Sequence, residues 1–177
     1  ILAKESYIKA ITLNPDYAKA HYNLAGALYE LNEFDDSIQS YQNALAIESD
    51  YAEAHNNLGN VFKAKGQLDL AIKSYGTAID LKPDYIESHY SLGTSFYESG
   101  KLKETAKCYE RVLEFRPNFT EIHNNLGNVL KELGRLDDAV LSYKTAISID
   151  PDFVEVYFNL GTTFQELNQL TDAVKHY

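Results

Sequence analysis

Residues 52 to 85 read AEAHNNLGNVFKAKGQLDLAIKSYGTAIDLKPDY, and this pattern of residues recurs along the chain with a fixed period of 34 residues. One tyrosine per period makes the repetition plain. These tyrosines are Tyr7, Tyr41, Tyr75, Tyr109, Tyr143 and Tyr177. A unit repeated in register stacks on copies of itself, and it predicts an elongated array with a long shared surface.

Each unit is predicted to be a pair of packed helices. Large apolar residues recur at helical spacing within it, as at Leu58 and Phe62 and again at Tyr75 and Ile79. Small residues occupy the positions where two helices must approach closely, as in the columns that contain Gly59 and Ala78.

The turns between helices are marked by proline, glycine and asparagine. One column holds Pro15, Pro83, Pro117 and Pro151, with Ser49 in the second copy. Aspartate follows the proline and glutamate comes three residues later, as in Asp84 to Glu87, which predicts a capping box at the first helix. The other turn carries Asn32, Gly66, Gly100, Gly134 and Asn168, residue types that tolerate a left-handed backbone.

These signals predict nine complete helices, with short helical remnants at both ends of the chain. The expected ranges are 18–31, 35–48, 52–65, 69–82, 86–99, 103–116, 120–133, 137–150 and 154–167.

The helix–turn–helix unit, with Leu58-Gly59, Tyr75 and a closing Pro83, resembles the tetratricopeptide repeat. The resemblance implies an all-α, right-handed solenoid that forms a single array. Residues 18–51, 52–85, 86–119 and 120–153 are whole copies, and residues 1–17 and 154–177 are partial ones, which indicates a fragment of a longer array. The line from His55 to Phe62 is particularly similar to the repeats of O-linked N-acetylglucosamine transferases and their bacterial relatives.

Composition restricts the partners. With 26 acidic and 16 basic residues the net charge is −10, which argues against nucleic acid. The basic row Lys103, Lys107 and Arg111 is interpreted as a solvated outer face. No apolar run is long enough for a membrane span, so no membrane insertion is expected. One cysteine, Cys108, fits a reducing compartment and favours an intracellular, cytoplasmic protein.

No chemistry is expected of the repeated polar columns. The histidines His21, His55, His89 and His123 share one column. Equivalent residues of stacked helices lie roughly 8–10 Å apart, whereas zinc needs each nitrogen within about 2.1 Å. A packing role is therefore predicted for these histidines. No nucleophile stands beside a base and no phosphate loop occurs, so neither enzymatic activity, nor a cofactor, nor a metal is predicted.

An asparagine column carries the functional hypothesis: Asn23, Asn57, Asn125 and Asn159, with Ser91 as a gap. Asparagine is mildly unfavourable inside a helix, so its recurrence needs a reason. The same helical face holds Asn60, Asn128, Tyr22, Asn56, Tyr90 and Asn124. The resemblance implies that this face lines a concave groove, where amides can pair with the backbone of an extended peptide. Alternatively, the asparagines bridge adjacent repeats or hold water.

An acidic rim sets the expected charge of the ligand: Glu53, Glu87, Glu121 and Glu155. It favours a neutral or basic segment and excludes a clamp for a terminal carboxylate. The function predicted first is a non-catalytic scaffold for protein–protein interaction that binds a peptide or an extended partner segment. The alternative is the substrate-recognition arm of a glycosyltransferase similar to the O-linked N-acetylglucosamine transferases, whose catalytic domain lies outside this chain. End-to-end self-association is a third possibility.

Overall fold

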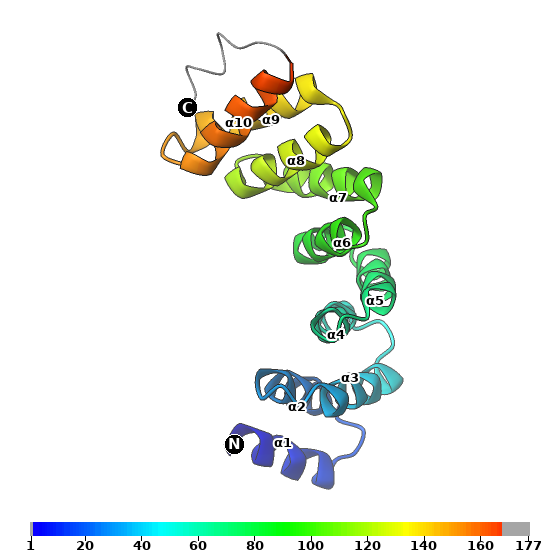
Figure 1. Ribbon diagram of the computed structural model, residues 1–177. Helices are drawn as coiled ribbons and strands as arrows, with labels where there is room; N and C mark the ends of the chain where they lie inside the picture. The colour runs from blue at the N-terminus through cyan, green and yellow to red at the C-terminus, as the bar shows by residue number, and fades with distance from the viewer. Residues whose placement is uncertain (1, 168–177) are drawn as a thin grey trace. The chain divides into compact units, whose positions relative to one another are not determined.

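The computed structural model describes residues 2–167, and every regular element in that range is an α-helix (Figure 1). The helices are α1 (Leu2–Leu13), α2 (Ala18–Glu30), α3 (Phe34–Ile47), α4 (Ala52–Ala64), α5 (Leu68–Leu81), α6 (Ile86–Glu98), α7 (Leu102–Phe115), α8 (Thr120–Glu132), α9 (Leu136–Ile149) and α10 (Val154–Glu166). Each expected helix occurs within one residue of its expected bounds, and α1 is the expected remnant at the start. The remnant expected at the other end, with Asn168 and Tyr177, lies outside the described residues.

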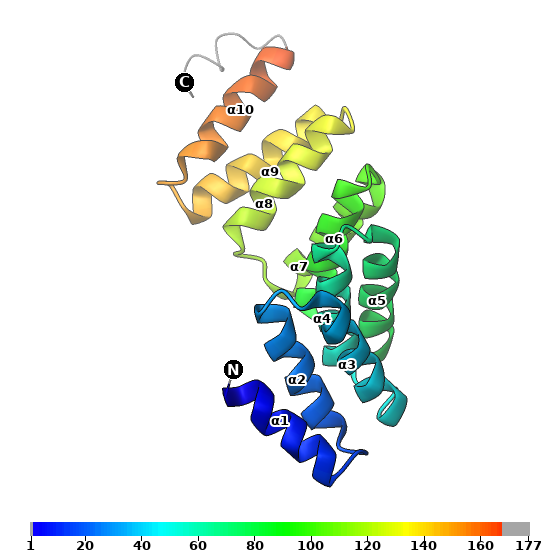
Figure 2. The same cartoon turned by 60° about the horizontal axis from the view of Figure 1, so that its bottom comes forward.

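The chain divides into two compact units, residues 1–95 and residues 96–177. In the first unit α2 packs on α3 and α4 packs on α5, and the two hairpins meet through α3 and α4. In the second unit α8 packs on α9, with α7 against α8 and α10 against α9. Figures 1 and 2 show these neighbours side by side within each unit. The fold is therefore an all-α solenoid of helix–turn–helix repeats.

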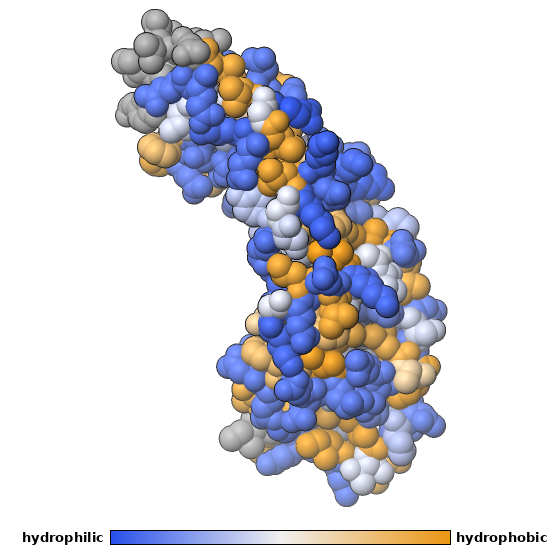
Figure 3. All heavy atoms as spheres, turned by 45° about the vertical axis from the view of Figure 1, so that its right-hand side comes forward, coloured by the Kyte–Doolittle hydropathy of each residue, from blue (hydrophilic) through white to orange (hydrophobic). Residues whose placement is uncertain are grey.

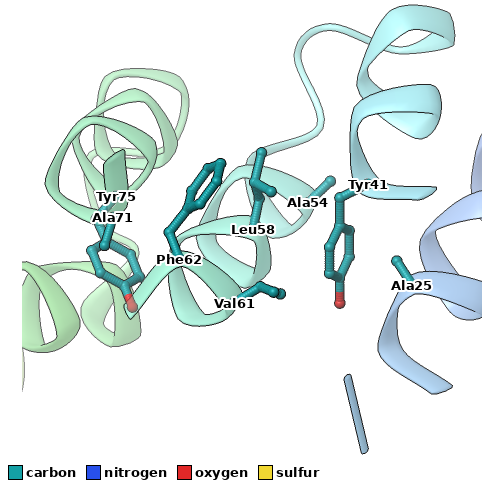
Figure 4. Close-up of a cluster of buried hydrophobic side chains, with 8 residues drawn as sticks. All are labelled: Ala25, Tyr41, Ala54, Leu58, Val61, Phe62, Ala71 and Tyr75. Atoms are coloured by element: carbon teal, nitrogen blue, oxygen red, sulfur yellow. The ribbon is translucent and has the colours of Figure 1, made fainter. Parts of the chain in front are cut away.

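The core of the first unit explains the tyrosine and glycine columns. Tyr75 is fully buried, and its ring lies directly against the backbone at Gly59. A Cβ atom placed on Gly59 would lie 2.6 Å from Cε1 of Tyr75, and one on Gly127 would lie 2.5 Å from Cε1 of Tyr143. Figure 4 shows the surrounding cluster of Ala25, Tyr41, Ala54, Leu58, Val61, Phe62, Ala71 and Tyr75. Glycine at this column makes room for an aromatic ring.

The turn within each repeat adopts the left-handed backbone that the sequence predicts. The backbone angle φ is 58° at Asn32, 72° at Gly66, 71° at Gly100 and 74° at Gly134. At Gly66 the amide donates to the carbonyl of Lys63 at 2.9 Å, so the turn closes the end of α4. The prediction from residue type is confirmed at these four positions.

The predicted capping boxes are wrong. The N-cap positions of α2, α4, α8 and α10 are aromatic, and none of them makes a side-chain cap: Tyr17, Tyr51, Phe119 and Phe153. The backbone carbonyl of Tyr51 instead accepts from the amides of Ala54 and His55, at 3.0 and 3.1 Å. The helix thus begins one residue later than a box would require, and the aspartate lies in the turn before it.

The histidine column ties each turn to the helix that follows. The Nε2 atom of His89 donates to the carbonyl oxygen of Pro83 at 2.9 Å. Equivalent bonds join His21 to Pro15 at 2.9 Å, His55 to Ser49 at 3.0 Å and His123 to Pro117 at 2.8 Å. The imidazole therefore donates a hydrogen bond to a backbone carbonyl of the turn and gives that carbonyl a partner. The histidines thus have the structural role that the sequence predicts.

Candidate ligand-binding face

The face of interest is formed by the first helix of each repeat. We define the first-helix face by the column Asn23, Asn57, Ser91, Asn125 and Asn159 and the residues beside it on α2, α4, α6, α8 and α10. All five side chains of the column are half-buried. They are thus positioned by packing while part of each remains accessible to solvent.

In the first unit, this face carries a chain of hydrogen bonds from one repeat to the next. The Nδ2 atom of Asn57 donates to the hydroxyl of Tyr22 on α2 at 2.8 Å. The Nδ2 atom of Asn56 donates to Oδ1 of Asn57 at 3.1 Å, and Oγ of Ser88 donates to Oδ1 of Asn56 at 2.8 Å. Asn56 is only 5% exposed. Its amide joins α4 to α6 rather than facing solvent.

The second unit also has side-chain hydrogen bonds between repeats on this face, with different partners. The Nδ2 atom of Asn159 donates to Oδ1 of Asn124 at 3.0 Å, and Nδ2 of Asn124 donates to Oε1 of Glu155 at 3.3 Å. Asn124 is 3% exposed. Asn57 and Asn159 therefore bridge adjacent repeats, as in the alternative that the sequence left open, through their bonds to Tyr22 and Asn124. The buried residues Asn56 and Asn124 also take part in these bridges.

Asn60 and Asn128 hold the column tyrosines of their own repeats. The hydroxyl of Tyr75 donates to Oδ1 of Asn60 at 2.7 Å, and the hydroxyl of Tyr143 donates to Oδ1 of Asn128 at the same distance. Both asparagines are half-buried. This bond fixes the ring that packs on Gly59 or Gly127.

The repeats alternate between two kinds, with a period of 68 residues. Residues 55–61 and 123–129 have the identical sequence HNNLGNV. The intervening repeats carry Gly26, Thr94 or Thr162 where these carry Asn60 and Asn128. The two kinds interact, because Nζ of Lys63 donates to Thr94 at 2.9 Å and Nζ of Lys131 donates to Thr162 at 3.0 Å. The sequence shows this alternation, but reading one column at a time misses it.

Each unit contains a small pocket on this face, and the two pockets are equivalent. The first pocket, of about 220 Å³, is lined by Gly26, Tyr29, Glu30, Tyr41, Asn57 and Asn60. The second pocket, of about 180 Å³, is lined by Tyr97, Tyr109, Asn125, Asn128 and Val129. Both are built from two tyrosines of one repeat and two asparagines of the next, at positions 68 residues apart. Tyr29, Tyr41, Tyr97 and Tyr109 were not among the predicted site residues.

A wider hollow of about 490 Å³ adjoins the second pocket and shares Tyr97 and Asn128 with it. The hydroxyl of Tyr97 donates to Oε1 of Glu132 at 2.5 Å. That bond, with a smaller effect from burial, raises the pKa of Tyr97. Lys131 pairs with Glu166 at 2.8 Å, so the hollow contains both charges.

The acidic rim is partly compensated. Lys82 lies 3.3 Å from Oε1 of Glu53, and its ammonium also lies 4.8 Å from the centre of the Tyr85 ring. Burial, reinforced by the charge of Glu53, raises the pKa of Tyr85 to about 12. Glu87, Glu121 and Glu155 are exposed.

Aromatic side chains lie beside the amides. Tyr22 is half-buried and stacks on Tyr51 with ring centres 4.8 Å apart. Tyr90 is 39% exposed and Phe158 is 57% exposed. On the surface shown in Figure 3 most residues are hydrophilic, and hydrophobic residues lie between them.

The basic row lies on α7, where Arg111 pairs with Glu114. Lys103 and Lys107 are exposed and line a separate hollow with Glu110 and Arg135.

No helix among residues 2–167 has the length and apolarity needed to cross a membrane.

Comparison with known proteins identifies the repeats. The TPR repeat family model matches residues 25–66, 59–100, 93–134 and 127–168. The chain belongs to the TPR repeat family. Comparison of this TPR array with curated proteins found no match. The expected likeness to the repeats of O-linked N-acetylglucosamine transferases in particular stays a prediction.

Solved structures of other proteins are similar to this array. YrrB, described as a TPR protein with an unusual peptide-binding site, has a TM-score of 0.88 and 26% identity over 98% of this chain and 89% of its own. MamA has a TM-score of 0.85 and 22% identity over 90% and 87%. MamA from Desulfovibrio magneticus RS-1 has a TM-score of 0.82 and 16% identity over 90% of each chain. The two MamA matches show likeness of fold.

Proposed function

We propose that this TPR array is a non-catalytic scaffold that holds an extended peptide, or an extended segment of a partner protein, along the first-helix face. The observation that carries the proposal is the row of half-buried amides at Asn57, Asn125 and Asn159, each beside a hollow of the surface. The described peptide-binding site of the similar protein YrrB supports it.

The amides have the chemistry that a peptide backbone needs. A primary amide has two N–H donors and an acceptor oxygen. The bonds of Asn57 to Tyr22 and of Asn159 to Asn124 each use one donor hydrogen. The second hydrogen of each nitrogen can donate to a peptide carbonyl. The bridging bonds also hold the side chain in one orientation, which lowers the entropic cost of binding.

Charge selects among extended segments. The array has a net charge of −10, and Glu87 and Glu121 are exposed near this face. A neutral or basic segment is therefore favoured over an acidic one. The preference should weaken as salt is added, because exposed charges are screened over about 10 Å at 0.1 M ionic strength.

A triple variant tests the proposal. Replacing Asn57, Asn125 and Asn159 by alanine should weaken peptide binding by about 1.5–4 kcal/mol, because each neutral hydrogen bond contributes about 0.5–1.5 kcal/mol. Titration calorimetry with a peptide library measures the effect, and circular dichroism checks the fold. The matched control is Gln42→Ala, an exposed polar residue on α3. Equal affinities of the triple variant and the natural protein would reject this face as the site.

The second candidate function is the substrate-recognition arm of an enzyme similar to the O-linked N-acetylglucosamine transferases. The twofold occurrence of HNNLGNV, within the line that most resembles those repeats, favours it. The coding sequence beyond residue 177 decides between the two functions. A nucleotide-sugar transferase domain there supports the arm, and its absence rejects it.

A further inference from the structure

We infer that each of the two equivalent pockets receives an arginine side chain of a bound segment, so that the array recognises arginine within its ligands. The inference rests on the proposed function and assigns it a specificity. The first pocket is defined by Tyr29, Tyr41, Asn57 and Asn60, and the second pocket by Tyr97, Tyr109, Asn125 and Asn128.

The size of the pockets points to a single side chain. Sites for small molecules commonly measure about 300–1,000 Å³. The first pocket measures about 220 Å³ and the second about 180 Å³, below that range. A single extended side chain is the occupant that a bound peptide would supply.

The lining favours a planar cation. The ring of Tyr29, which is half-buried, and the ring of Tyr97, which is 42% exposed, each offer a face for stacking. A guanidinium both stacks on such a face and is attracted by its electrons. The amide oxygens of the asparagines and the tyrosine hydroxyls accept hydrogen bonds, and arginine has five N–H donors.

The charge around the pockets argues against an acidic side chain as the occupant. Glu30 lines the first pocket, and Glu132 accepts from the hydroxyl of Tyr97 at the second. An acidic side chain would be repelled by these carboxylates, while a cation would be attracted. The two pockets reach this character with different glutamates. Glu30 belongs to the repeat that supplies the tyrosines of the first pocket, whereas Glu132 belongs to the repeat that supplies the asparagines of the second.

The alternation of the repeats limits the arginine sites to every second repeat. At the position of Tyr29 and Tyr97, the repeats that contain HNNLGNV have Lys63 and Lys131 instead. Their ammonium groups bond to Thr94 and Thr162. A guanidinium at these repeats would meet a like charge in place of a tyrosine ring. Arginine is therefore recognised at the two pockets rather than by a continuous preference for basic residues.

The first experiment uses the full chain labelled with ¹⁵N and short acetylated, amidated peptides. One peptide carries a single arginine among glycine and serine, and the other carries citrulline, its neutral isostere, at the same place. The side-chain amide signals of Asn57, Asn60, Asn125 and Asn128 should shift with arginine at both pockets. Citrulline should bind at least about fivefold more weakly, since it lacks the cationic attraction to the ring.

Single variants separate the pockets. Tyr29→Ala should remove the response at the first pocket and preserve it at the second, and Tyr97→Ala should do the converse. Tyr29→Phe keeps the ring and should keep the arginine preference. Tyr17→Ala, at an exposed tyrosine outside both pockets, is the matched control. The dispersion of the backbone amide spectrum shows that each variant is folded.

The outcomes separate the inference from the proposed function. Equal binding of arginine and citrulline peptides, with shifts at the asparagines, would overturn the inference and leave backbone binding intact. A response at one pocket only, or a single variant that silences both, would also overturn it. Absence of any shift with either peptide and with an all-alanine peptide would overturn the proposed function as well.

Discussion

The absence of a side chain at residue 59 lets the ring of Tyr75 lie on the backbone of α4. The ring cannot retreat easily, because it is fully buried and its hydroxyl is bound to Asn60. A methyl group at residue 59 would sit 2.6 Å from the ring, closer than real Cβ atoms approach their neighbours. Either α4 and α5 separate or the tyrosine leaves its position.

Gly59→Ala should therefore lower the free energy of unfolding by about 1–3 kcal/mol, as overpacking of a rigid core does. Urea denaturation measures the change. The first repeat shows how the cost can be avoided, since it has Ala25 followed by Gly26 at these positions. The double variant Gly59→Ala with Asn60→Gly copies that pair and releases the tyrosine hydroxyl. Its loss should be smaller than the sum of the two single losses, and an additive loss would contradict the clash.

Gly76 provides the opposite case. It lies inside α5, and a Cβ atom there would meet nothing within 4 Å. Gly76→Ala should raise the free energy of unfolding by about 0.5–1 kcal/mol, since alanine loses less backbone entropy in a helix. Thermal denaturation followed by circular dichroism measures it. A lower melting temperature would show that glycine is needed at this position for another reason.

Prediction of single residues from the sequence succeeds where the residue type determines the backbone conformation. It fails where the contacts of a side chain with its neighbours determine its role. The left-handed turns follow from the residue types of Asn32 and Gly66 and are found there. The predicted capping boxes are wrong because an aromatic residue occupies the N-cap position, and its backbone carbonyl accepts from the first turn of the helix. Burial differs between the adjacent residues Asn56, which is buried, and Asn57, which is half-buried, and the sequence pattern does not reveal this difference.

At the scale of the helix, the contact between successive repeats depends on buried polar pairs. Ser88 on α6 is fully buried, and its hydroxyl donates to the buried amide oxygen of Asn56 on α4. Removing this hydroxyl removes a partner of Asn56 in a place that water does not readily reach. The pair therefore matters more than a surface hydrogen bond of the same length.

Ser88→Ala should lower the free energy of unfolding by about 1–3 kcal/mol, the cost of leaving a buried acceptor unsatisfied. Guanidinium denaturation measures this loss. Ser148→Ala is the matched control, because that serine is exposed on α9 and bonds only within its helix. Similar values for the two variants would contradict the importance of the bridge.

Helix bounds are the part of the fold that the sequence predicts best, because proline, glycine and apolar spacing mark each end. The two pockets are not predicted in this way. They arise because neighbouring repeats differ at two equivalent positions: one repeat has Gly26 and Tyr29 where the next has Asn60 and Lys63. A consensus of all the repeats hides both differences. Comparison of residues 68 apart retains them.

At the scale of the molecule, the buried tyrosine hydroxyls and the buried thiol of Cys108 make the stability of the fold depend on pH in the alkaline range. Burial raises the pKa of Cys108 to about 11 and that of Tyr85 to about 12. It also raises the pKa of Tyr41 and Tyr143. In the unfolded chain the thiol and the phenols lose their protons from about pH 9 and pH 10 respectively. The folded state retains more protons above that point.

Stability should therefore be full below about pH 9 and should fall as the pH rises toward 12, because the unfolded state is then the one that binds fewer protons. Melting temperatures measured by circular dichroism between pH 7 and pH 11 test this. Cys108→Ser, which copies the serine at the same column in other repeats, should remove the earliest part of the decline. A melting temperature that is constant up to pH 11 would contradict the expected linkage.

The short span of the bridges has a consequence for the kinetics of folding. The side-chain hydrogen bonds described between helices join residues at most 35 positions apart, as from Asn57 to Tyr22 and from Asn159 to Asn124. Closing such loops costs little chain entropy, and proteins with local contacts fold quickly. Within each unit, a repeat can begin to fold wherever a first hairpin forms and can then recruit its neighbour. The order in which repeats fold should thus follow their relative stabilities, so that Gly59→Ala would delay its own repeat and redirect the starting point to another.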